Sequence, residues 1–361
     1  MRVPSLVREI GIAAAFGLLV SMTVAQLPKL RSRDGVSNRE KSYDRERPQL
    51  SAKPGGAARE PHQIPLSGWR DILRRTSHEL GRDRVFAVAA GVSFYGLLAV
   101  IPALTSFVSL YGLVADPETI VEHLALAEGF LPADAFNLVR DQLTRISSGS
   151  DTTLGLALVV SLALSIWSAN AGVKAIFDAL NVAYGEDEKR GLVRLNLISL
   201  AFTSGILVFL VAALGAITAV PILLDFLSLH VAMEWLLWLG RWPLLAAVLM
   251  LGLAVLYRFG PSRDEARWSW VSPGAVFASI TWLIGSALFS WYVANFEDYN
   301  KTYGALGAAV GLLMWMWLSA NIVLIGAELN SEAERQTHRD TTKGPPLPIG
   351  MRGADAADRK D

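Results

Sequence analysis

The chain contains no cysteine, and this absence removes several kinds of chemistry at once. Disulfide bonds, thiolate metal sites and cysteine nucleophiles are all excluded, although the absence does not identify a compartment. Charged side chains are also scarce, at 18% of 361 residues, whereas a soluble domain carries roughly a quarter. The formal net charge is zero, so no overall field favours nucleic acid as a partner.

Motifs for metal-dependent or nucleotide-dependent catalysis are missing as well. The five histidines are dispersed, without an H-x-H or H-E-x-x-H pattern. The sequence has no G-x-x-x-x-G-K-[ST] phosphate loop and no G-x-S-x-G nucleophile elbow. We therefore expect no enzyme activity, no catalytic residues, no cofactor and no metal.

Hydrophobic residues, by contrast, make up 52% of the chain, and the mean hydropathy is +0.36. They gather in segments close to the ~20 residues that cross a bilayer. These segments lie near 10–27, 85–114, 154–172, 195–224, 242–258, 270–296 and 303–327. We predict an all-α, polytopic transmembrane helical bundle with a six-span core and one extra N-terminal hydrophobic segment.

The N-terminal segment, residues 1–27, has two interpretations. Its basic start and the tripeptide Thr23-Val24-Ala25 resemble a secretory signal peptide with a cleavage site. Its length and the basic segment behind it favour an uncleaved membrane anchor instead. That following segment, residues 28–66, holds nine Lys/Arg against five Asp/Glu and is typical of a disordered linker beside anionic lipid.

Residues 67–82 predict an amphipathic helix in the membrane interface. One face carries Trp69, Ile72, Leu73, Thr76 and Leu80, and the arginines lie away from that face. The membrane domain that begins here is expected to end at residue 332. A disordered tail, residues 333–361, is expected to follow it.

Loop charges predict the orientation in the membrane. The segment 116–152 carries seven acidic and two basic residues, and its apolar spacing predicts an extracytoplasmic helical loop. The connections around residues 185–194 and 258–267 carry six Lys/Arg and are expected to be cytoplasmic. The linker and the C-terminus are then cytoplasmic too.

The last hydrophobic segment, "YGALGAAVGLLMWMWLSANIVLIGAELN", has one continuous face of small and polar residues. Gly304, Gly307 and Gly311 begin this face, and Asn321 and Glu328 continue it at spacings of three and four. Small residues let membrane helices approach closely, and costly polar groups point into protein rather than lipid. We expect this face to pack inside the bundle.

Polar or small faces recur on three other spans. Asn170, Lys174, Asp178 and Asn181 follow one another at spacings of four, four and three. The remaining candidates for a polar path or gate are Tyr95, Tyr292 and Asn295, and the remaining packing positions are Gly91, Gly274 and Gly285. Such faces form either a hydrogen-bonded core or a solute path, and Lys174 with Asp178 form either a gate or an interfacial pair.

Four stretches carry a family resemblance: "AAGVSFYGLLAVIPAL", "SIWSANAGVKAIFDALNVAYGEDEKRG", "YRFGP" and the last hydrophobic segment. Over residues 68–332 the chain resembles the YihY/BrkB family of bacterial inner-membrane proteins. The resemblance implies about six spans with both ends of that core in the cytoplasm. Members have carried the label of a tRNA-processing ribonuclease, for which this sequence lacks metal-binding histidine clusters. One member is associated by name with serum resistance in virulence.

We therefore expect an inner-membrane protein that transports a solute or lipid through a polar-lined bundle. The alternative is a membrane scaffold or envelope assembly factor that transports nothing, and a ribonuclease is a remote third. Membrane lipids are the expected partners and nucleic acid is not. The substrate is unknown, and a homo-oligomer is left open.

Overall fold

The structure is a computed structural model, and it describes residues 53–111, 152–226, 230–295 and 305–358. Its elements are a 3-10 helix η1 (Pro61–Gln63) and the helices α3 (Leu66–Arg82), α4 (Val85–Tyr111), α7 (Thr152–Tyr184), α8 (Leu192–Phe226), α9 (His230–Phe259), α10 (Trp268–Asn295), α12 (Ala305–Gln336) and α13 (Asp355–Asp358). No β-strand occurs in these ranges, where one isolated bridge joins Ala266 to Thr342.

The helical membrane bundle is confirmed by these elements. Among the described residues, four stretches are long and apolar enough to cross a membrane, and they are Val85–Phe107, Leu192–Ala212, Trp268–Tyr292 and Ala309–Gln336. A shorter apolar stretch, Pro243–Phe259, lies in α9. The count of six spans stays a prediction. The N-terminal hydrophobic segment and the acidic loop up to residue 151 lie outside the described residues.

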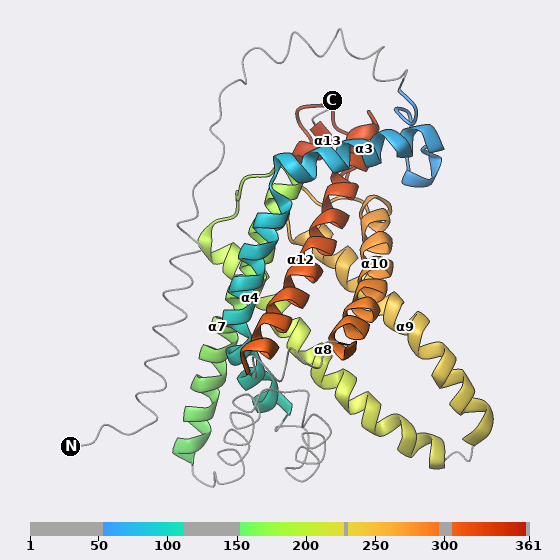
Figure 1. The fold of residues 1–361 in the computed structure, drawn as a ribbon. Coiled ribbons are helices and arrows are strands. Elements are labelled where there is room, and N and C mark those ends of the chain that lie inside the picture. The colour runs from blue at the N-terminus through green and yellow to red at the C-terminus, as the bar shows by residue number, and fades with distance from the viewer. Residues whose placement is uncertain (1–52, 112–151, 227–229, 296–304, 359–361) are drawn as a thin grey trace.

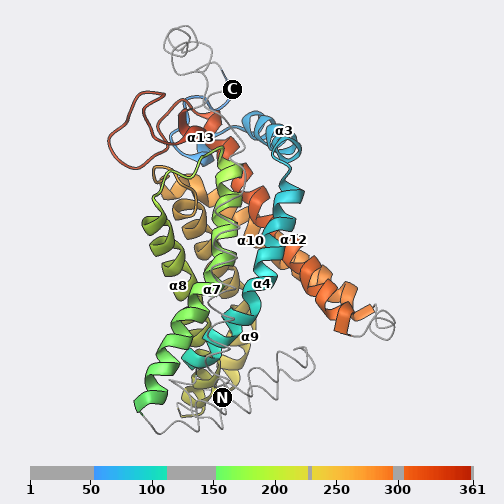
Figure 2. The same cartoon turned by 90° about the vertical axis from the view of Figure 1, so that its left-hand side faces the viewer.

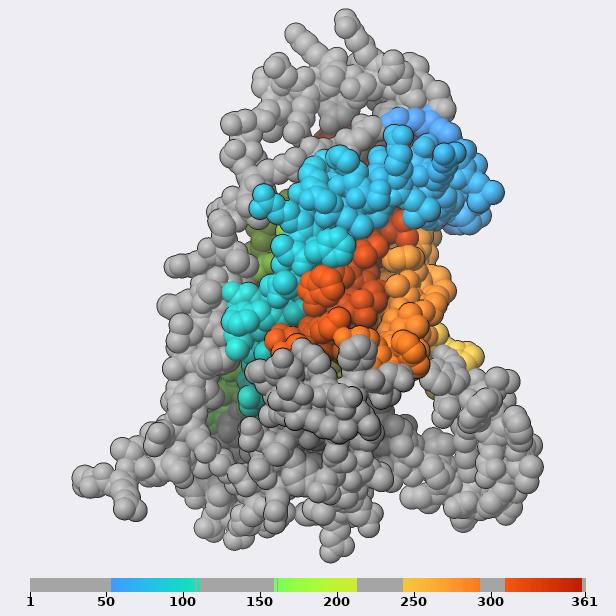
Figure 3. All heavy atoms as spheres, in the orientation of Figure 1, coloured from blue at the N-terminus to red at the C-terminus, as the bar shows by residue number. Residues whose placement is uncertain are grey.

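The long helices converge at one end and separate toward the other (Figures 1 and 2). Helix α12 lies at the centre of the converging end, where it contacts α3, α4, α7, α10 and α13. Helix α3 lies across that end, almost perpendicular to the bundle (Figure 1). Its turn into α4 passes through Arg84, whose φ of 51° lies in the left-handed region. The space-filling view shows α3, α4 and α12 as neighbours on one face (Figure 3).

Very small residues allow α10 and α12 to touch along their backbones. A methyl group added at Gly274 would clash with the carbonyl oxygen of Gly326. The Tyr257 hydroxyl of α9 lies against Gly326 as well and donates a 2.8 Å hydrogen bond to the Val323 carbonyl. Close backbone approach of this kind is how membrane helices gain packing energy without a hydrophobic driving force.

Helix α3 buries a different face from the one that its sequence predicts. Ile72 and Thr76 are buried as expected, but their buried neighbours are Gly68 and Glu79. Leu73, which the predicted apolar face includes, is 56% exposed. The reason is that α3 packs on α12, so protein contacts select the face that is buried.

The C-terminal segment also differs from the expected disordered tail. Helix α12 continues to Gln336, and the residues up to 358 fold against the converging end (Figure 1). The Arg352 guanidinium organises this segment by donating to the carbonyls of His338, Arg339, Leu347 and Ala357. The polar composition that suggested disorder serves contacts with other loops, which composition alone does not show.

Candidate functional site

A polar stripe runs between α7 and α8. On α7 it consists of Asn170, Lys174 and Asp178, and on α8 of Asn196, Ser199 and Thr203. The Thr203 hydroxyl lies 3.1 Å from Asn170 Oδ1, which fixes the register of the two helices. Because the helices are antiparallel, the next turn of each brings Lys174 and Ser199 to the same level. The two are buried, with 7% and 0% exposure.

Several polar atoms of this stripe have no hydrogen-bond partner among the described residues. They include Asn170 Nδ2 and Asn196 Oδ1, both buried. The Lys174 ammonium lies 5.4 Å from the centre of the Trp167 ring. Buried polar groups are normally paired because an unmet donor or acceptor costs about 1–3 kcal/mol. The stripe therefore has spare capacity to bind a polar group.

The predicted face of α12 is buried at Asn321 and Glu328, whereas a methyl group added at Gly311 would meet no described atom within 4 Å. The two buried polar residues are only partly satisfied. Asn321 donates from Nδ2 to the Trp317 carbonyl of its own helix, 2.7 Å away, while its Oδ1 has no partner in the described part of the chain. Glu328 is 1% exposed, and its Oε1 is likewise unpaired there. Like Asn196 Oδ1 of the α7–α8 stripe, these two oxygen atoms are buried and have no hydrogen-bond donor in the described chain.

Two other amide side chains act as links between elements. Asn330 accepts a 2.7 Å bond from the Gly274 amide and donates to the Val271 carbonyl, so it joins α12 to α10. Asn181, a predicted site residue, accepts from the Ser262 amide and donates to Glu188. In both amides the oxygen accepts a bond from a neighbouring backbone amide and the nitrogen donates a bond to another element.

A group of buried ion pairs closes the converging end, and we call it the cap. Arg263 and Glu334 form its centre, with a 2.6 Å contact and no exposure of either side chain. The guanidinium of Arg263 also lies 4.3 Å from the Tyr184 ring centre. Glu332 accepts from Arg75 of α3 at 2.6 Å and from Arg335 at 2.8 Å. The cap therefore ties α3, the 260–267 turn and α12 together.

Carboxylates at the edge of the cap show opposite shifts. Burial raises the pKa of Glu186, although its bonds from the Lys189 ammonium and the Asp355 amide act in the other direction. Burial has the same effect on Glu188, but hydrogen bonds and the charge of Arg190 outweigh it and hold the pKa of Glu188 below its usual value. The loop 185–190 thus contains one carboxylate held charged and one drawn toward its neutral form.

The remaining predicted residues lie apart from these clusters. Tyr95 is half-buried on α4, and Tyr292 stacks on Phe289 of its own helix and is 40% exposed. Asn295 is the last residue of α10, and its side chain is outside the described part, as are Gly304 and the surroundings of Gly307. Gly285 faces Ile322 and Leu318 of α12. A methyl group added at Gly91 or Gly311 would meet no described atom within 4 Å.

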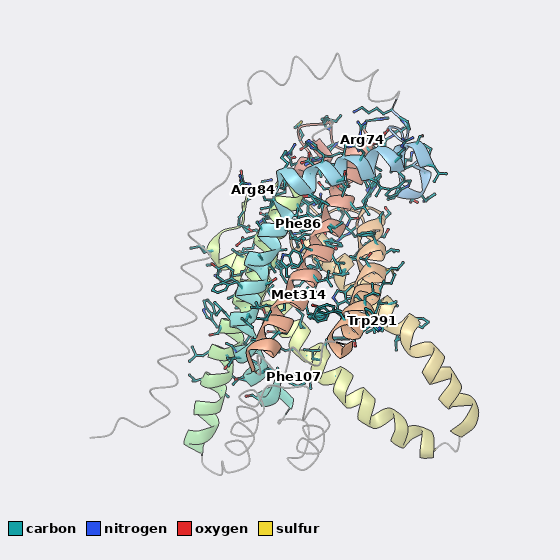
Figure 4. All side chains as sticks on the ribbon, viewed as in Figure 1. Arg74, Arg84, Phe86, Phe107, Trp291 and Met314 are labelled. Carbon is teal, nitrogen blue, oxygen red and sulfur yellow. The ribbon has the colours of Figure 1, made fainter. Side chains whose placement is uncertain are left out.

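Aromatic side chains mark the boundary of the polar clusters. The Trp317 indole donates to the Phe86 carbonyl at 3.0 Å, and the Trp282 indole donates to the Ser319 hydroxyl at 3.0 Å. Figure 4 places Phe86 beside α12, with Arg74 and Arg84 at the α3 end and Met314 and Trp291 nearer the separating end. These indoles pack the bundle rather than line the polar stripe.

Comparison with known proteins agrees with this membrane architecture. The sequence profile of the family described as virulence factor BrkB matches residues 76–348, which include the bundle and most of the cap. The chain belongs to this family. The match also confirms the resemblance found in the sequence.

Relatives of this BrkB family chain come from several bacteria. A protein named as ribonuclease-like, YfkH of Bacillus subtilis strain 168, is 30% identical over 72% of the chain and 91% of its own length. A UPF0761 membrane protein of Vibrio cholerae serotype O1 is 28% identical over 79% of the chain and 94% of its own length. Another, from Vibrio campbellii, is 27% identical over 74% and 82%. No solved structure matches.

Sequence reasoning found the α7 side of the polar stripe but missed its α8 side. Asn196, Ser199 and Thr203 are spaced by three and four residues within an apolar helix, and this spacing was a signal for them. The central ion pair of the cap had no such signal. Arg263 and Glu334 are 71 residues apart, and only the fold brings them together.

Proposed function

We propose that this membrane protein transports a solute or lipid along the polar surfaces of α7, α8 and α12. The observation that carries the proposal is the set of buried, unpaired polar atoms in the stripe, chiefly Asn170 Nδ2 and Asn196 Oδ1. Asn330, by contrast, joins α12 to α10 with both its amide oxygen and its amide nitrogen bonded. Polar groups inside membrane bundles commonly mark ion or substrate pathways.

The cap would act as the closed cytoplasmic gate of this path. It joins α3, the 260–267 turn and α12 through ion pairs that include Arg263–Glu334 and Arg75–Glu332. Ion pairs are suited to a gate because charged side chains can exchange partners, which gives the closed and the open state each its own set of pairs.

Reconstitution of the full chain into vesicles tests this function directly. The vesicles are assayed for flux of ions, phosphorylated metabolites, amino acids, sugars and fluorescent phospholipids. Thr203→Val removes the hydroxyl that reaches Asn170. Thr105→Val is the matched control, because within the described residues the Thr105 hydroxyl donates to the Ile101 carbonyl of its own helix. We expect Thr203→Val to lower the flux at least severalfold while Thr105→Val leaves it unchanged.

The scaffold alternative predicts a different result. If the wild-type protein moves nothing in the panel and Thr203→Val only lowers the free energy of unfolding, the polar stripe joins helices and transport is refuted. If Thr203→Val instead inserts and folds like the wild type but loses flux, the result supports a transport path. Circular dichroism and the yield of folded protein after purification separate the two outcomes.

A further inference from the structure

The polar stripe holds a lysine whose ammonium group lacks a hydrogen-bond acceptor in the described part of the chain. Lys174 is 7% exposed, and in the described part of the chain no oxygen accepts a hydrogen bond from its ammonium group. The contacts that it does have are the Trp167 ring, 5.4 Å away, and the through-space attraction of Asp178. A buried ammonium normally has a paired, hydrogen-bonding partner because burial of a bare charge is costly.

Asn170 places a second spare donor one helical turn from Lys174. Its side chain is fully buried and its Nδ2 is unpaired within the described chain. The neighbouring Thr203 hydroxyl has one proton to donate, and the Ser199 carbonyl at 2.9 Å competes with Asn170 for it. Reversing the amide of Asn170 would still leave one of its two N–H groups free. The site therefore offers donors in either orientation.

Asp178 does not supply the missing acceptor. It lies one turn beyond Lys174, and no hydrogen bond joins the two in the described chain; among its charged neighbours, repulsion by Glu188 acts on it most strongly, followed by attraction by Arg190 and then by Lys174. Its other charged neighbour is Glu188, which is itself bonded to Arg190. Asp178 thus interacts with the charges of the loop at the cap as well as with Lys174, and it leaves the Lys174 ammonium without a hydrogen-bond acceptor in the described chain.

We propose that Lys174 and Asn170 bind an anionic oxygen group of the transported cargo. The inference rests on the proposed transport function and names the chemical class of its substrate. Residues one turn apart have Cβ atoms about 5–6 Å apart, a spacing that lets two donors reach two oxygens of one phosphate or carboxylate. Trp167, which is 39% exposed, lies beside the ammonium and provides an apolar contact for the rest of the molecule.

Binding measurements on the full chain in phosphatidylcholine nanodiscs test this site without requiring transport. The anionic probes are inorganic phosphate, succinate and short-chain phosphatidylglycerol, and the neutral comparators, which carry no anionic oxygen group, are glycerol and short-chain diacylglycerol. Binding is read from the shift in unfolding temperature across a concentration series. Binding of phosphate or succinate indicates a free anion as the cargo, and binding of phosphatidylglycerol alone indicates a lipid headgroup.

Variants of the two charged residues give predictions of opposite sign. Lys174→Gln removes a charge-assisted hydrogen bond and is expected to weaken binding of the anionic probe about tenfold or more. Lys174→Arg keeps the charge and should retain binding. Asp178→Asn removes a nearby negative charge and should strengthen binding. Lys343→Gln is the control, because Lys343 is a 70% exposed lysine that lies beside Glu265.

Four results would overturn the proposal. Anionic probes that bind no better than the neutral comparators would refute an anionic site. So would a Lys174→Gln protein that binds as well as the wild type. Weakening of equal size in Lys174→Gln and Asp178→Asn would show that the two residues pair with each other. Transport of an uncharged solute unaffected by Lys174→Gln would refute the anionic cargo while leaving the transport function standing.

Discussion

The central ion pair of the cap should be among the most sensitive positions in the chain. Glu334→Gln keeps the size of the side chain and its bond to the Thr341 hydroxyl, but removes the charge opposite Arg263. Removing one partner of a buried pair costs about 3–5 kcal/mol because the other charge stays buried and uncompensated. The Tyr184 ring, 4.3 Å from the guanidinium, supplies part of the lost stabilisation, so we expect about 3 kcal/mol.

The free energy of unfolding is measured in mixed micelles by titration with denaturing detergent, followed by far-ultraviolet circular dichroism. A matched control is Lys343→Gln at the cap surface, where Lys343 and Glu265 lie 3.6 Å apart with 70% and 41% exposure. Exposed pairs of this kind contribute about 0–1 kcal/mol. The double variant Arg263→Met with Glu334→Leu removes both charges, and we expect it to recover most of the loss.

Two results would refute this reasoning. A loss below about 1 kcal/mol in Glu334→Gln would mean that the pair behaves like a surface ion pair. A double variant as unstable as the single one would mean that shape, and not an unpaired charge, causes the loss. Either result would also weaken the cap as a gate.

Three further predictions concern single side chains. Asn330→Ala should lower the free energy of unfolding by about 2–4 kcal/mol, because it leaves the Gly274 amide and the Val271 carbonyl without the Asn330 side chain. Asn321→Ala should lower it by less than about 1 kcal/mol, because in the described chain the Asn321 side chain bonds to the Trp317 carbonyl of its own helix. Gly274→Ala should abolish most folded protein after purification, because its methyl group meets the α12 backbone. Burial tends to raise the pKa of Asp340, but hydrogen bonds from Leu347 and Thr342 and the charge of Arg352 outweigh it and hold the pKa below 3.8. The charged Asp340 therefore stabilises the folded protein fully above pH 3.8, and this stabilisation is lost as the pH falls through the lowered pKa. Asp340→Asn should therefore destabilise the protein at pH 7 and flatten the loss of stability below pH 4.

Each of these has a result that contradicts it. An equal loss of unfolding free energy in Asn330→Ala and Asn321→Ala would show that the bond between helices stabilises the protein no more than the bond within one helix. Normal yield of Gly274→Ala would show that α10 and α12 separate without penalty. An unfolding free energy with the same pH dependence in Asp340→Asn as in the wild type would exclude Asp340 as a contributor to the acid response.

Much of the bundle could be predicted from the sequence because lipid imposes a simple rule on spanning segments. Every backbone polar group in the hydrocarbon must be satisfied locally, so long apolar runs become helices. The predicted segments near 85–114, 195–224 and 270–296 accordingly match α4, α8 and α10 within a few residues. The end of α12 could not be predicted in this way. Beyond residue 327 most of its residues are polar, and they form ion pairs with α3 and with the 260–267 turn, which lie far away in the sequence.

The candidate site also has a part that the sequence predicts and a part that only the fold reveals. Asn170 and Lys174 were predicted because spacing on one helix reports a shared face. Their neighbours on α8 and the pairing of Arg263 with Glu334 depend on the relative placement of helices, which local periodicity does not contain. The function of Asn181 shows a further limit. It shares the α7 face with Lys174, yet the fold uses it to hold the Ser262 amide.

The tail also connects the two described ends of the chain mechanically. The Gln336 side chain donates to the Pro54 carbonyl and accepts from Arg75, and the His338 amide donates to the Gly56 carbonyl. Tension on the segment preceding residue 54 would therefore reach the end of α12 through a few hydrogen bonds. A pull from the N-terminal side would load the cap before it stretched any membrane helix.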